Sequence, residues 1–420
     1  MRYTTLSEWL DWLESLHPKT IDLGLERVRT VGERLGILNP SATVITVGGT
    51  NGKGSCVAFL SEIYQSAGYQ IGAYTSPHLL YYNERIVING NRVSDDALMA
   101  AFSAIDNARG DISLTYFEFG TLAAFWLFFQ QKLDVWILEV GLGGRLDAVN
   151  IIDNDVAIIA SIDLDHMEYL GSTREQIGYE KAGIFRENKC AVVADDDTPV
   201  SIIDHAKKIN TNLYVINKEF CYHYDTANSC WSFVAGERRY DNLPLVSLKL
   251  SNACASLMTV ELLQECLPVS HDALCAGLKK ARVLGRFWQL SSHPTCIVDV
   301  AHNPAAAKEL AKHLKLNKVA GKTVAVVGIL QDKDIRGIIS ALLPVIDTWY
   351  LASLSGPRGS SAAELALVFD ELRQYQYQLA DTVAAAYKQA VELASRADRV
   401  VVFGSFLTVA QVISLGNSGE

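Results

Sequence analysis

Paired cysteines at metal-binding or redox spacing are absent from this chain. Its eight cysteines are scattered, and no two of them form a C-x-x-C pair. The first residues, MRYTTLSEW, lack the cationic and then apolar segments of a signal peptide. We therefore expect reduced thiols, mostly in the core, and a cytoplasmic location.

Long apolar runs and excess positive charge are missing as well. The most apolar run, near residues 122–129, is far shorter than the roughly 20 residues that span a bilayer. The formal net charge of −10 opposes binding to nucleic acids or anionic membranes, because such binding depends on clustered Lys and Arg. We expect neither partner, whereas small anionic substrates fit a cleft with its own local field. Nothing resembles a dimerisation segment, so a monomer is expected.

What is present is enough apolar sequence for two domains. The chain has 420 residues, of which 49% are hydrophobic and 20% charged. After an amphipathic helix over 6–16, apolar segments alternate with helical ones, and the expected strands are 44–47, 71–75, 135–140, 156–161 and 190–194. Continuous apolar runs are typical of parallel strands covered on both faces. We predict an α/β fold whose N-terminal domain is a doubly wound, mostly parallel sheet.

Two changes of pattern follow that domain core. Short strands with polar breaks, over 213–216, 220–224 and 231–234, predict a small antiparallel flap. A second α/β alternation begins near 295, with strands expected at 295–300, 323–328, 348–352 and 399–403. Placing the boundary at Gly285 gives domains of residues 1–285 and 286–420, the second a smaller Rossmann-like α/β domain.

A glycine-rich turn joins the first apolar strand to a helical segment. It has the sequence GGTNGKGS over residues 48–55. Glycines let backbone N–H groups approach phosphate oxygens, the helix N-terminus adds partial positive charge, and Lys53 adds a full charge. Ser55 offers an oxygen to Mg²⁺. The spacing departs from the usual P-loop at Val47 and Gly54, but the arrangement still predicts nucleotide binding.

Polar residues also follow three other strands, at the edge of the sheet where ligands bind. Ser76, Glu139 and His166 lie at those positions and, with Ser55, suggest a nucleotide–metal centre. Oxygen ligands favour Mg²⁺, and an imidazole would also suit Mn²⁺. A structural turn Ser and a hydrogen-bonded His are the alternatives for Ser76 and His166.

Three further polar residues have ordinary explanations from sequence alone. Lys181 is predicted to be a solvated helix lysine. Asp299 ends a strand and is a candidate for ribose or metal-linked contacts. Arg286 lies at the expected domain boundary, where it is either a surface residue or able to reach a transferring phosphoryl group.

Taken together and in order, these motifs resemble the folylpolyglutamate synthase family of ATP-dependent, Mur-ligase-like amide ligases. The segments that carry the resemblance are GTNGKGS (49–55), SPHL (76–79), NERI (83–86), LEVGLGGRLD (138–147), LDH (164–166), EKAGI (180–184), LGRF (284–287) and DVAHNP (299–304). Val149, where many relatives have Thr, and the additional acid Asp163 depart from the pattern without removing a proposed ligand.

The resemblance implies a role for each motif. It assigns ATP binding to Thr50, Asn51, Gly52, Lys53, Gly54, Ser55, Asn252, Arg286 and Asp299. It assigns metal binding, with two Mg²⁺ ions expected and Mn²⁺ plausible, to Ser76, Glu139, His166 and a carbamylated Lys181. Lys53, Lys181, His166 and Arg286 would be the catalytic residues. A monovalent cation is a further candidate cofactor.

The resemblance also implies the reaction. Dihydropteroate would be held by Asp22, Leu23, Gly24, Thr115, Tyr116, Phe117, Glu118, Leu146, Asp147 and Ala148. The enzyme would add L-glutamate to dihydropteroate and to reduced folates, with ATP converting the acceptor carboxylate into an acyl phosphate. The alternatives are a ligase of the same mechanism with another acceptor, an enzyme with only one of the two activities, and a non-catalytic nucleotide- or folate-binding regulator.

Overall fold

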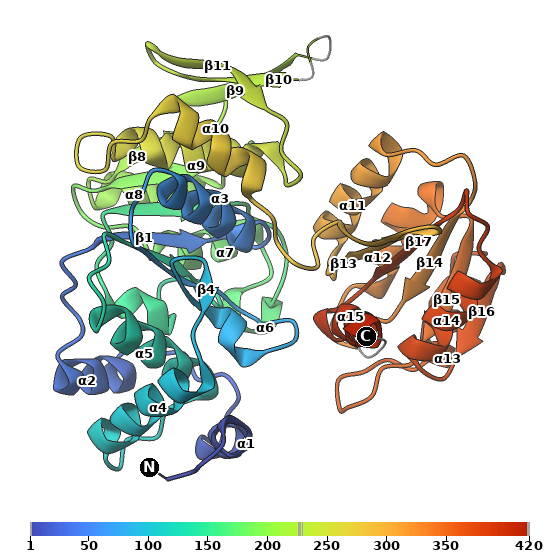
Figure 1. The fold of residues 1–420 in the computed structure, drawn as a ribbon, viewed down its shortest axis with the longest axis horizontal. Coiled ribbons are helices and arrows are strands. Elements are labelled where there is room, and N and C mark those ends of the chain that lie inside the picture. The colour runs from blue at the N-terminus through green and yellow to red at the C-terminus, as the bar shows by residue number, and fades with distance from the viewer. Residues whose placement is uncertain (1, 226–227, 229, 418–420) are drawn as a thin grey trace. The chain divides into compact units, whose positions relative to one another are not determined.

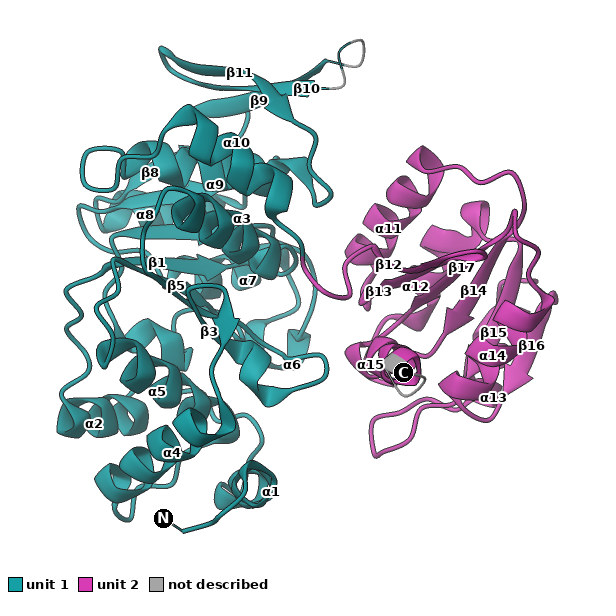
Figure 2. Cartoon of the chain, in the orientation of Figure 1, with its two compact units in different colours: residues 1–282 teal, residues 283–420 magenta. Residues whose placement is uncertain are grey.

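The computed structural model describes residues 2–225, 228 and 230–417 of the chain (Figure 1). The chain divides into two compact units, Met1–Arg282 and Val283–Glu420 (Figure 2). Each unit has its own sheet and its own core.

Unit 1 is built on an eight-stranded sheet with the order β4-β3-β2-β5-β1-β6-β7-β8. The strands are β1 (Thr43–Gly48), β2 (Ile71–Tyr74), β3 (Ile86–Ile88), β4 (Asn91–Arg92), β5 (Val135–Glu139), β6 (Val156–Ile159), β7 (Cys190–Val193) and β8 (Asn212–Val215). Pairing is parallel from β2 through β8, and β3 and β4 join as an antiparallel edge. The predicted doubly wound, mostly parallel sheet is confirmed.

The position of β8 corrects one expectation. We assigned residues 213–216 to the antiparallel flap, but β8 pairs parallel with β7 at the edge of the main sheet. Helix α8 (Val200–Lys208) lies between the two strands. A helical crossover of this kind returns the chain in the same direction, which favours a parallel strand over a hairpin partner.

Helices cover this sheet. They are α1 (Leu6–Leu16), α2 (Glu26–Leu35), α3 (Lys53–Ser66), α4 (Asp95–Arg109), α5 (Tyr116–Phe129), α6 (Met167–Leu170), α7 (Arg174–Ala182), α9 (Leu250–Leu262) and α10 (His271–Lys280), in addition to α8. The described part of the chain also contains three short 3₁₀ turns: Tyr82–Arg85, Ala148–Ile151 and, in unit 2, Leu343–Val345. Within the described residues, no helix is both long enough and apolar enough to cross a membrane.

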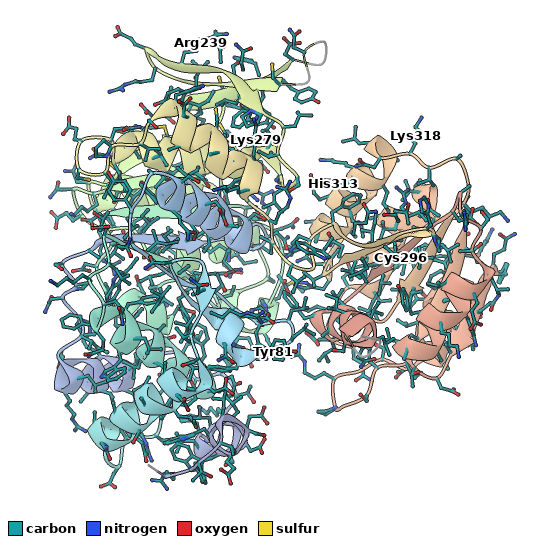
Figure 3. All side chains as sticks on the ribbon, viewed as in Figure 1. Tyr81, Arg239, Lys279, Cys296, His313 and Lys318 are labelled. Atoms are coloured by element: carbon teal, nitrogen blue, oxygen red, sulfur yellow. The ribbon has the colours of Figure 1, made fainter. Side chains whose placement is uncertain are left out.

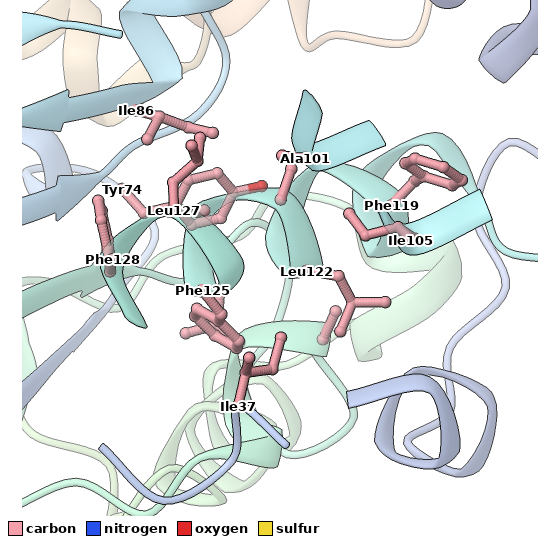
Figure 4. Packing of buried hydrophobic residues seen from close by; sticks show 14 of the residues in the cluster. Ile37, Tyr74, Ile86, Ala101, Ile105, Phe119, Leu122, Phe125, Leu127 and Phe128 are labelled. Atoms are coloured by element: carbon pink, nitrogen blue, oxygen red, sulfur yellow. The ribbon is translucent and has the colours of Figure 1, made fainter. Parts of the chain in front are cut away.

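The largest core of unit 1 forms around α5. This helix is apolar on nearly every side, because α2, α4 and strand β2 all pack against it. Figure 4 shows Phe119, Leu122 and Phe125 of α5 among the side chains of this core, with Ile105 of α4 nearby. Fully burying a side chain of this size contributes roughly 1.5–3 kcal/mol. The buried helix α5 therefore holds the residues at its N-terminus in a fixed position.

A three-stranded antiparallel flap follows the main sheet, in the order β11-β10-β9. Its strands are β9 (Phe220–Asp225), β10 (Cys230–Ala235) and β11 (Arg238–Pro244). Phe220, Trp231 and Phe233 are buried, whereas Arg239 of β11 is exposed and lies on the outer strand (Figure 3). The flap was predicted from the sequence, but β11 was not, because its residues RRYDNLP carry little strand signal.

Unit 2 contains a six-stranded sheet with the order β12-β13-β17-β14-β15-β16. Its strands are β12 (Trp288–Ser292), β13 (Thr295–Asp299), β14 (Thr323–Val327), β15 (Thr348–Ala352), β16 (Tyr377–Ala380) and β17 (Arg399–Phe403). Its helices are α11 (Pro304–Leu316), α12 (Ile335–Leu342), α13 (Ala362–Glu371), α14 (Val383–Leu393) and α15 (Phe406–Asn417). All pairs are parallel except β12 with β13, which confirms the second, Rossmann-like α/β fold.

Candidate functional site

The glycine-rich loop lies between β1 and α3, as the sequence predicted. Gly52 precedes the helix with a φ of 90°, a left-handed conformation that favours glycine. A Cβ at this position would lie 2.6 Å from the Asn252 amide nitrogen on α9. Residue 52 must therefore lack a side chain for two reasons, and Asn252 lies directly against the loop. The Asn252 Oδ1 atom is buried and has no hydrogen-bond partner within the described residues.

Hydrogen bonds to the segment after β6 hold this loop in shape. The Thr50 N–H donates to the Ser161 carbonyl at 2.7 Å, and the Asn51 N–H donates to Ser161 Oγ at 3.0 Å. Thr50 Oγ1 accepts from the Asp163 N–H at 3.0 Å. Lys53 Nζ donates to the Gly49 carbonyl at 3.0 Å and the Thr50 carbonyl at 3.3 Å. The loop is thus ordered by the protein itself, with its lysine folded over it.

Glu139 ends β5 between the neighbouring strands β1 and β2, where Val47 is its partner in register. Its side chain is buried, and Oε2 accepts the Ser76 N–H at 3.2 Å. A Cβ added at Gly54 would lie 3.8 Å from the same oxygen. The structure therefore brings Glu139 and Ser76 together beside the first turn of α3, whose positive end stabilises a carboxylate. Ser55, in that same turn, is buried.

His166 lies in the loop after β6, immediately before the short helix α6. It has a positive φ of 51°, and its side chain is 39% exposed. Its Nε2 atom lies 4.0 Å from Asp165 Oδ1. Among the residues that the structure describes, no three His, Cys, Asp or Glu side chains gather closely enough to hold a metal ion.

Lys181 lies in the last turn of α7 and is 3% exposed, so the expectation of a solvated helix lysine is wrong. Lys181 is buried because other parts of unit 1 cover the side of α7 on which it lies. The sequence of this short helix does not reveal that. Burial, together with the nearby positive charge of Lys53, lowers the pKa of Lys181 to about 7, while Asp165 and Asp147 act in the opposite direction. Burial thus favours the unprotonated form of this amine.

Asp147 is buried at the end of the glycine-rich segment 141–147. Its carboxylate accepts the Leu142 N–H at 2.9 Å and the Val149 N–H at 3.0 Å. Burial raises the pKa of Asp147 to about 6, although these backbone hydrogen bonds and the charge of Lys53 lower it. Lys53, Lys181 and Asp147 are thus close enough to influence one another's charge. Leu146 is half-buried and Ala148 is buried beside it.

The two segments expected to hold the pterin meet through one arginine. Arg27 Nη1 lies 2.7 Å from Asp22 Oδ2, and Arg27 Nη2 donates to Glu118 Oε1 at 3.0 Å. Thr115 and Glu118 form a capping box at the start of α5. Leu23, Gly24, Tyr116 and Phe117 are half-buried between these anchors and the neighbouring aromatic residues.

Two predicted residues lie in unit 2. The Asp299 carboxylate ends β13 and accepts the Phe287 N–H and the Ala301 N–H, each at 2.8 Å. Burial raises the pKa of Asp299, against the effects of the Arg286 charge and of these hydrogen bonds. Arg286 and Asp299 are therefore neighbours within unit 2.

Sequence reasoning gave no role to three residues of unit 1 that contact the predicted segments. Ser161 and Arg27 were not singled out, although a Ser directly after an apolar strand is a detectable signal. Arg85, only 8% exposed, donates from Nε to His78 Nδ1 at 2.8 Å, and its guanidinium lies 5.2 Å from the centroid of the Tyr82 ring. Burial and the charge of Arg85 lower the pKa of His78 to about 4.

Comparison with known families covers both units. The model of the Mur ligase middle domain matches residues 47–229, and the model of the Mur ligase glutamate ligase domain matches residues 285–406. These two ranges contain the glycine-rich loop, Glu139, Lys181, Arg286 and Asp299.

Individual relatives match nearly the whole chain. Dihydrofolate synthase/folylpolyglutamate synthase of Escherichia coli is 46% identical over 410 residues, which cover 98% of this chain and 95% of the relative. The structure of E. coli FolC in complex with DHPP and ADP superposes with a TM-score of 0.94 at 46% identity, covering 99% of this chain and 98% of that one. The Yersinia pestis bifunctional folylpolyglutamate synthase/dihydrofolate synthase, complexed with AMPPNP and Mn ion, gives 0.93 at 46% identity and 98% coverage of both chains. The chain therefore belongs to the dihydrofolate synthase/folylpolyglutamate synthase family of Mur ligases.

Proposed function

We propose that this chain is an ATP-dependent ligase that adds L-glutamate to dihydropteroate, forming dihydrofolate, and to reduced folates, forming polyglutamates. The observation that carries the proposal is the preordered glycine-rich loop with Glu139, Asp147 and Lys181 around it, in a chain that aligns end to end with this family. Residues 1–285 are assigned ATP and pterin binding, and residues 286–420 are assigned as the glutamate-ligase domain.

The glycine-rich loop is the proposed binding site of the ATP phosphates. These phosphates would contact the loop from Thr50 to Ser55, where Lys53 and the first turn of α3 supply positive charge. Asn252 supports this role because its amide touches Gly52. Arg286 and Asp299 are assigned to ATP by the family resemblance, and the charge of Arg286 acts on the Asp299 carboxyl within unit 2.

The donor set fits a divalent cation such as Mg²⁺ or Mn²⁺. Glu139 would provide a carboxylate, one oxygen of which accepts the Ser76 N–H; the Ser76 hydroxyl would provide a further oxygen, and His166 an imidazole. When bound, two such ions would neutralise the phosphoryl oxygens and orient the acceptor carboxylate. The set lacks one anionic ligand, which carbamylation of Lys181 would supply.

Carbamylation of Lys181 is a consequence of its burial. An unprotonated Nζ attacks the carbon of CO₂, an N–C bond forms, and one amine proton leaves to solvent. The product is a carbamate anion, and the reaction requires the neutral amine that burial favours. The positive charge of Lys53 would then stabilise the new anion.

The chemistry requires an acceptor carboxylate with a good leaving group. A carboxylate oxygen attacks the γ-phosphorus, the bond to the ADP oxygen breaks, and an acyl phosphate forms. The α-amine of L-glutamate then attacks the acyl carbon, phosphate departs, and the amine loses a proton. Lys53 and Arg286 would offset the repulsion between the two anions in the first step. The segments at Asp22 and Thr115 would place the pterin.

The remaining expectations stay proposals. We propose a monomer that binds neither nucleic acid nor membrane and acts in the cytoplasm, with a monovalent cation as a further candidate cofactor. The net charge of −10 and the unpaired thiols support these expectations.

One assay tests the function. ADP release is measured with ATP, Mg²⁺ and L-glutamate in the presence of dihydropteroate, tetrahydrofolate or no acceptor. We expect release with both acceptors and little without one. Release with only one acceptor would reduce the proposal to a single activity. If neither acceptor stimulates release by a folded protein that binds ATP, the proposed acceptors are wrong.

A further inference from the structure

The loop between α1 and α2 has little structure of its own. Residues 17–25 form neither helix nor strand, and no backbone–backbone hydrogen bond within the described residues involves the N–H or carbonyl groups of residues 18–24. A loop without such bonds depends on side chains for a fixed shape. The Asp22 carboxylate is the centre of those contacts, with Lys19 Nζ at 3.2 Å and His17 Nε2 at 3.6 Å.

The side chain of Arg27 joins this loop to another part of unit 1. It lies in the first turn of α2, and its guanidinium contacts Asp22 twice, at the carboxylate (2.7 Å) and at the backbone carbonyl (2.8 Å). The same group donates to Glu118, 91 residues further along the chain. A planar guanidinium can serve two partners in a fixed geometry, which a lysine ammonium does with far less directional control.

Glu118 is itself held firmly. Its side chain is 5% exposed, and Oε2 accepts the Thr115 N–H at 2.7 Å while Oε1 faces Arg27. Both oxygens are therefore engaged, one by the cap of the buried helix α5 and the other by Arg27. Arg27 therefore links this loop directly to the N-terminus of the buried helix α5. A Cβ at Gly24 would meet nothing within 4 Å, so space remains open beside the loop.

We propose that Arg27 is a positioning residue for acceptor binding: it locks the loop around Asp22 onto the N-terminus of α5, so that both segments meet the pterin in one fixed arrangement. This inference rests on the proposed function, because that function assigns the two segments to dihydropteroate. Arg27 does not react. It removes the need to order the loop when the acceptor binds, which strengthens binding.

The test compares Arg27→Gln with Arg27→Lys and with Arg34→Gln in the full chain. Arg34 is a matched control, because it lies on the same helix and donates to the carbonyls of Ala108 (2.9 Å) and Arg109 (3.0 Å) at the end of α4, away from both segments. KM for dihydropteroate, KM for ATP and kcat are measured for each, with amide hydrogen exchange of residues 18–24 and urea unfolding alongside.

We expect Arg27→Gln to raise KM for dihydropteroate by about tenfold, the ratio that corresponds to about 1.4 kcal/mol. KM for ATP should stay unchanged, and exchange at residues 18–24 should become faster. Arg27→Lys should raise KM for dihydropteroate by less, because lysine keeps the positive charge but lacks the planar guanidinium that donates to two partners. Arg34→Gln should leave KM for dihydropteroate unchanged. If Arg27→Gln does not fold, the Arg27→Lys variant carries the test.

An unchanged KM for dihydropteroate in a folded Arg27 variant would overturn the inference, as would an equal rise in the Arg34 variant. A fall in kcat alone would overturn it too, because positioning for binding predicts the change in KM. If the unsubstituted protein shows no dihydropteroate-dependent ADP release, the proposed function fails instead. That result is obtained before any substitution, so the two failures are distinguishable.

Discussion

The buried amine of Lys181 should make the stability of unit 1 depend on pH. A lysine in the unfolded chain keeps its ordinary pKa of 10.5, whereas burial lowers the folded value to about 7. Between these values the unfolded chain binds more protons, so stability rises with pH. Each pH unit between the two pKa values changes the free energy of unfolding by about 1.36 kcal/mol. The buried amine therefore lowers the free energy of unfolding by about 4 kcal/mol at pH 7 and by only about 2 kcal/mol at pH 9.

The substitution Lys181→Met removes this titration while keeping a side chain of similar length. We therefore expect the variant to be more stable than the unsubstituted protein at pH 7, and the difference to shrink by about 2 kcal/mol between pH 7 and pH 9. Urea unfolding at the two pH values measures it, in buffers freed of CO₂ so that no carbamate forms. The exposed residue Lys207 on α8 offers a matched control as Lys207→Met, with no pH-dependent difference expected. A difference for Lys181→Met that stays constant from pH 7 to pH 9 would refute the reasoning.

Four further outcomes follow from the site. Lys53→Ala should lower turnover by about a thousandfold with the circular dichroism spectrum unchanged, and near-normal ADP release would contradict its phosphate role. Lys181→Ala should be inactive but partly restored by acetate or formate, which can replace a carbamate; no restoration in a folded variant would argue against carbamylation. Because burial raises the pKa of Asp147 to about 6, the folded chain binds more protons than the unfolded chain above pH 4. Relative to Asp147→Asn, the unsubstituted protein should therefore lose about 2 kcal/mol of stability from pH 4 to pH 7, as urea unfolding would show. Chelation should stop acceptor-dependent ADP release, and Mg²⁺ or Mn²⁺ should restore it.

The sequence predicted the framework of both sheets because their central strands are continuous apolar runs. It failed at edges and short elements, where backbone pairing determines the structure more than side-chain pattern. Strand β11 contains three charged residues, and β16 has only four residues, one of them the polar Gln378, so neither shows a strand pattern. Strand β8 was assigned to the wrong sheet, since its own four residues do not tell whether the preceding chain crosses over.

Some residues of the candidate site could likewise be predicted from the sequence, and others could not. Motifs that follow strands, such as the loop before α3 and Glu139, could be placed from sequence because chain order brings strand ends together. The burial of Lys181 could not be predicted from the sequence, because it depends on which helices cover α7. The link from Arg27 to Glu118 joins residues far apart in sequence, and each residue alone is an ordinary charged residue on a helix.

The hydrogen bonds from the glycine-rich loop to Ser161 restrict how a phosphate can bind. The N–H groups of Thr50 and Asn51 already have acceptors in the protein, at 2.7 and 3.0 Å. If a phosphate binds at this loop as proposed, its oxygens would therefore find backbone N–H donors in the first turn of α3 rather than at Thr50 and Asn51. Ordering one loop residue costs roughly 1–2 kcal/mol. Because the protein itself orders this loop, that entropy is lost during folding and would not have to be lost again when the proposed nucleotide binds.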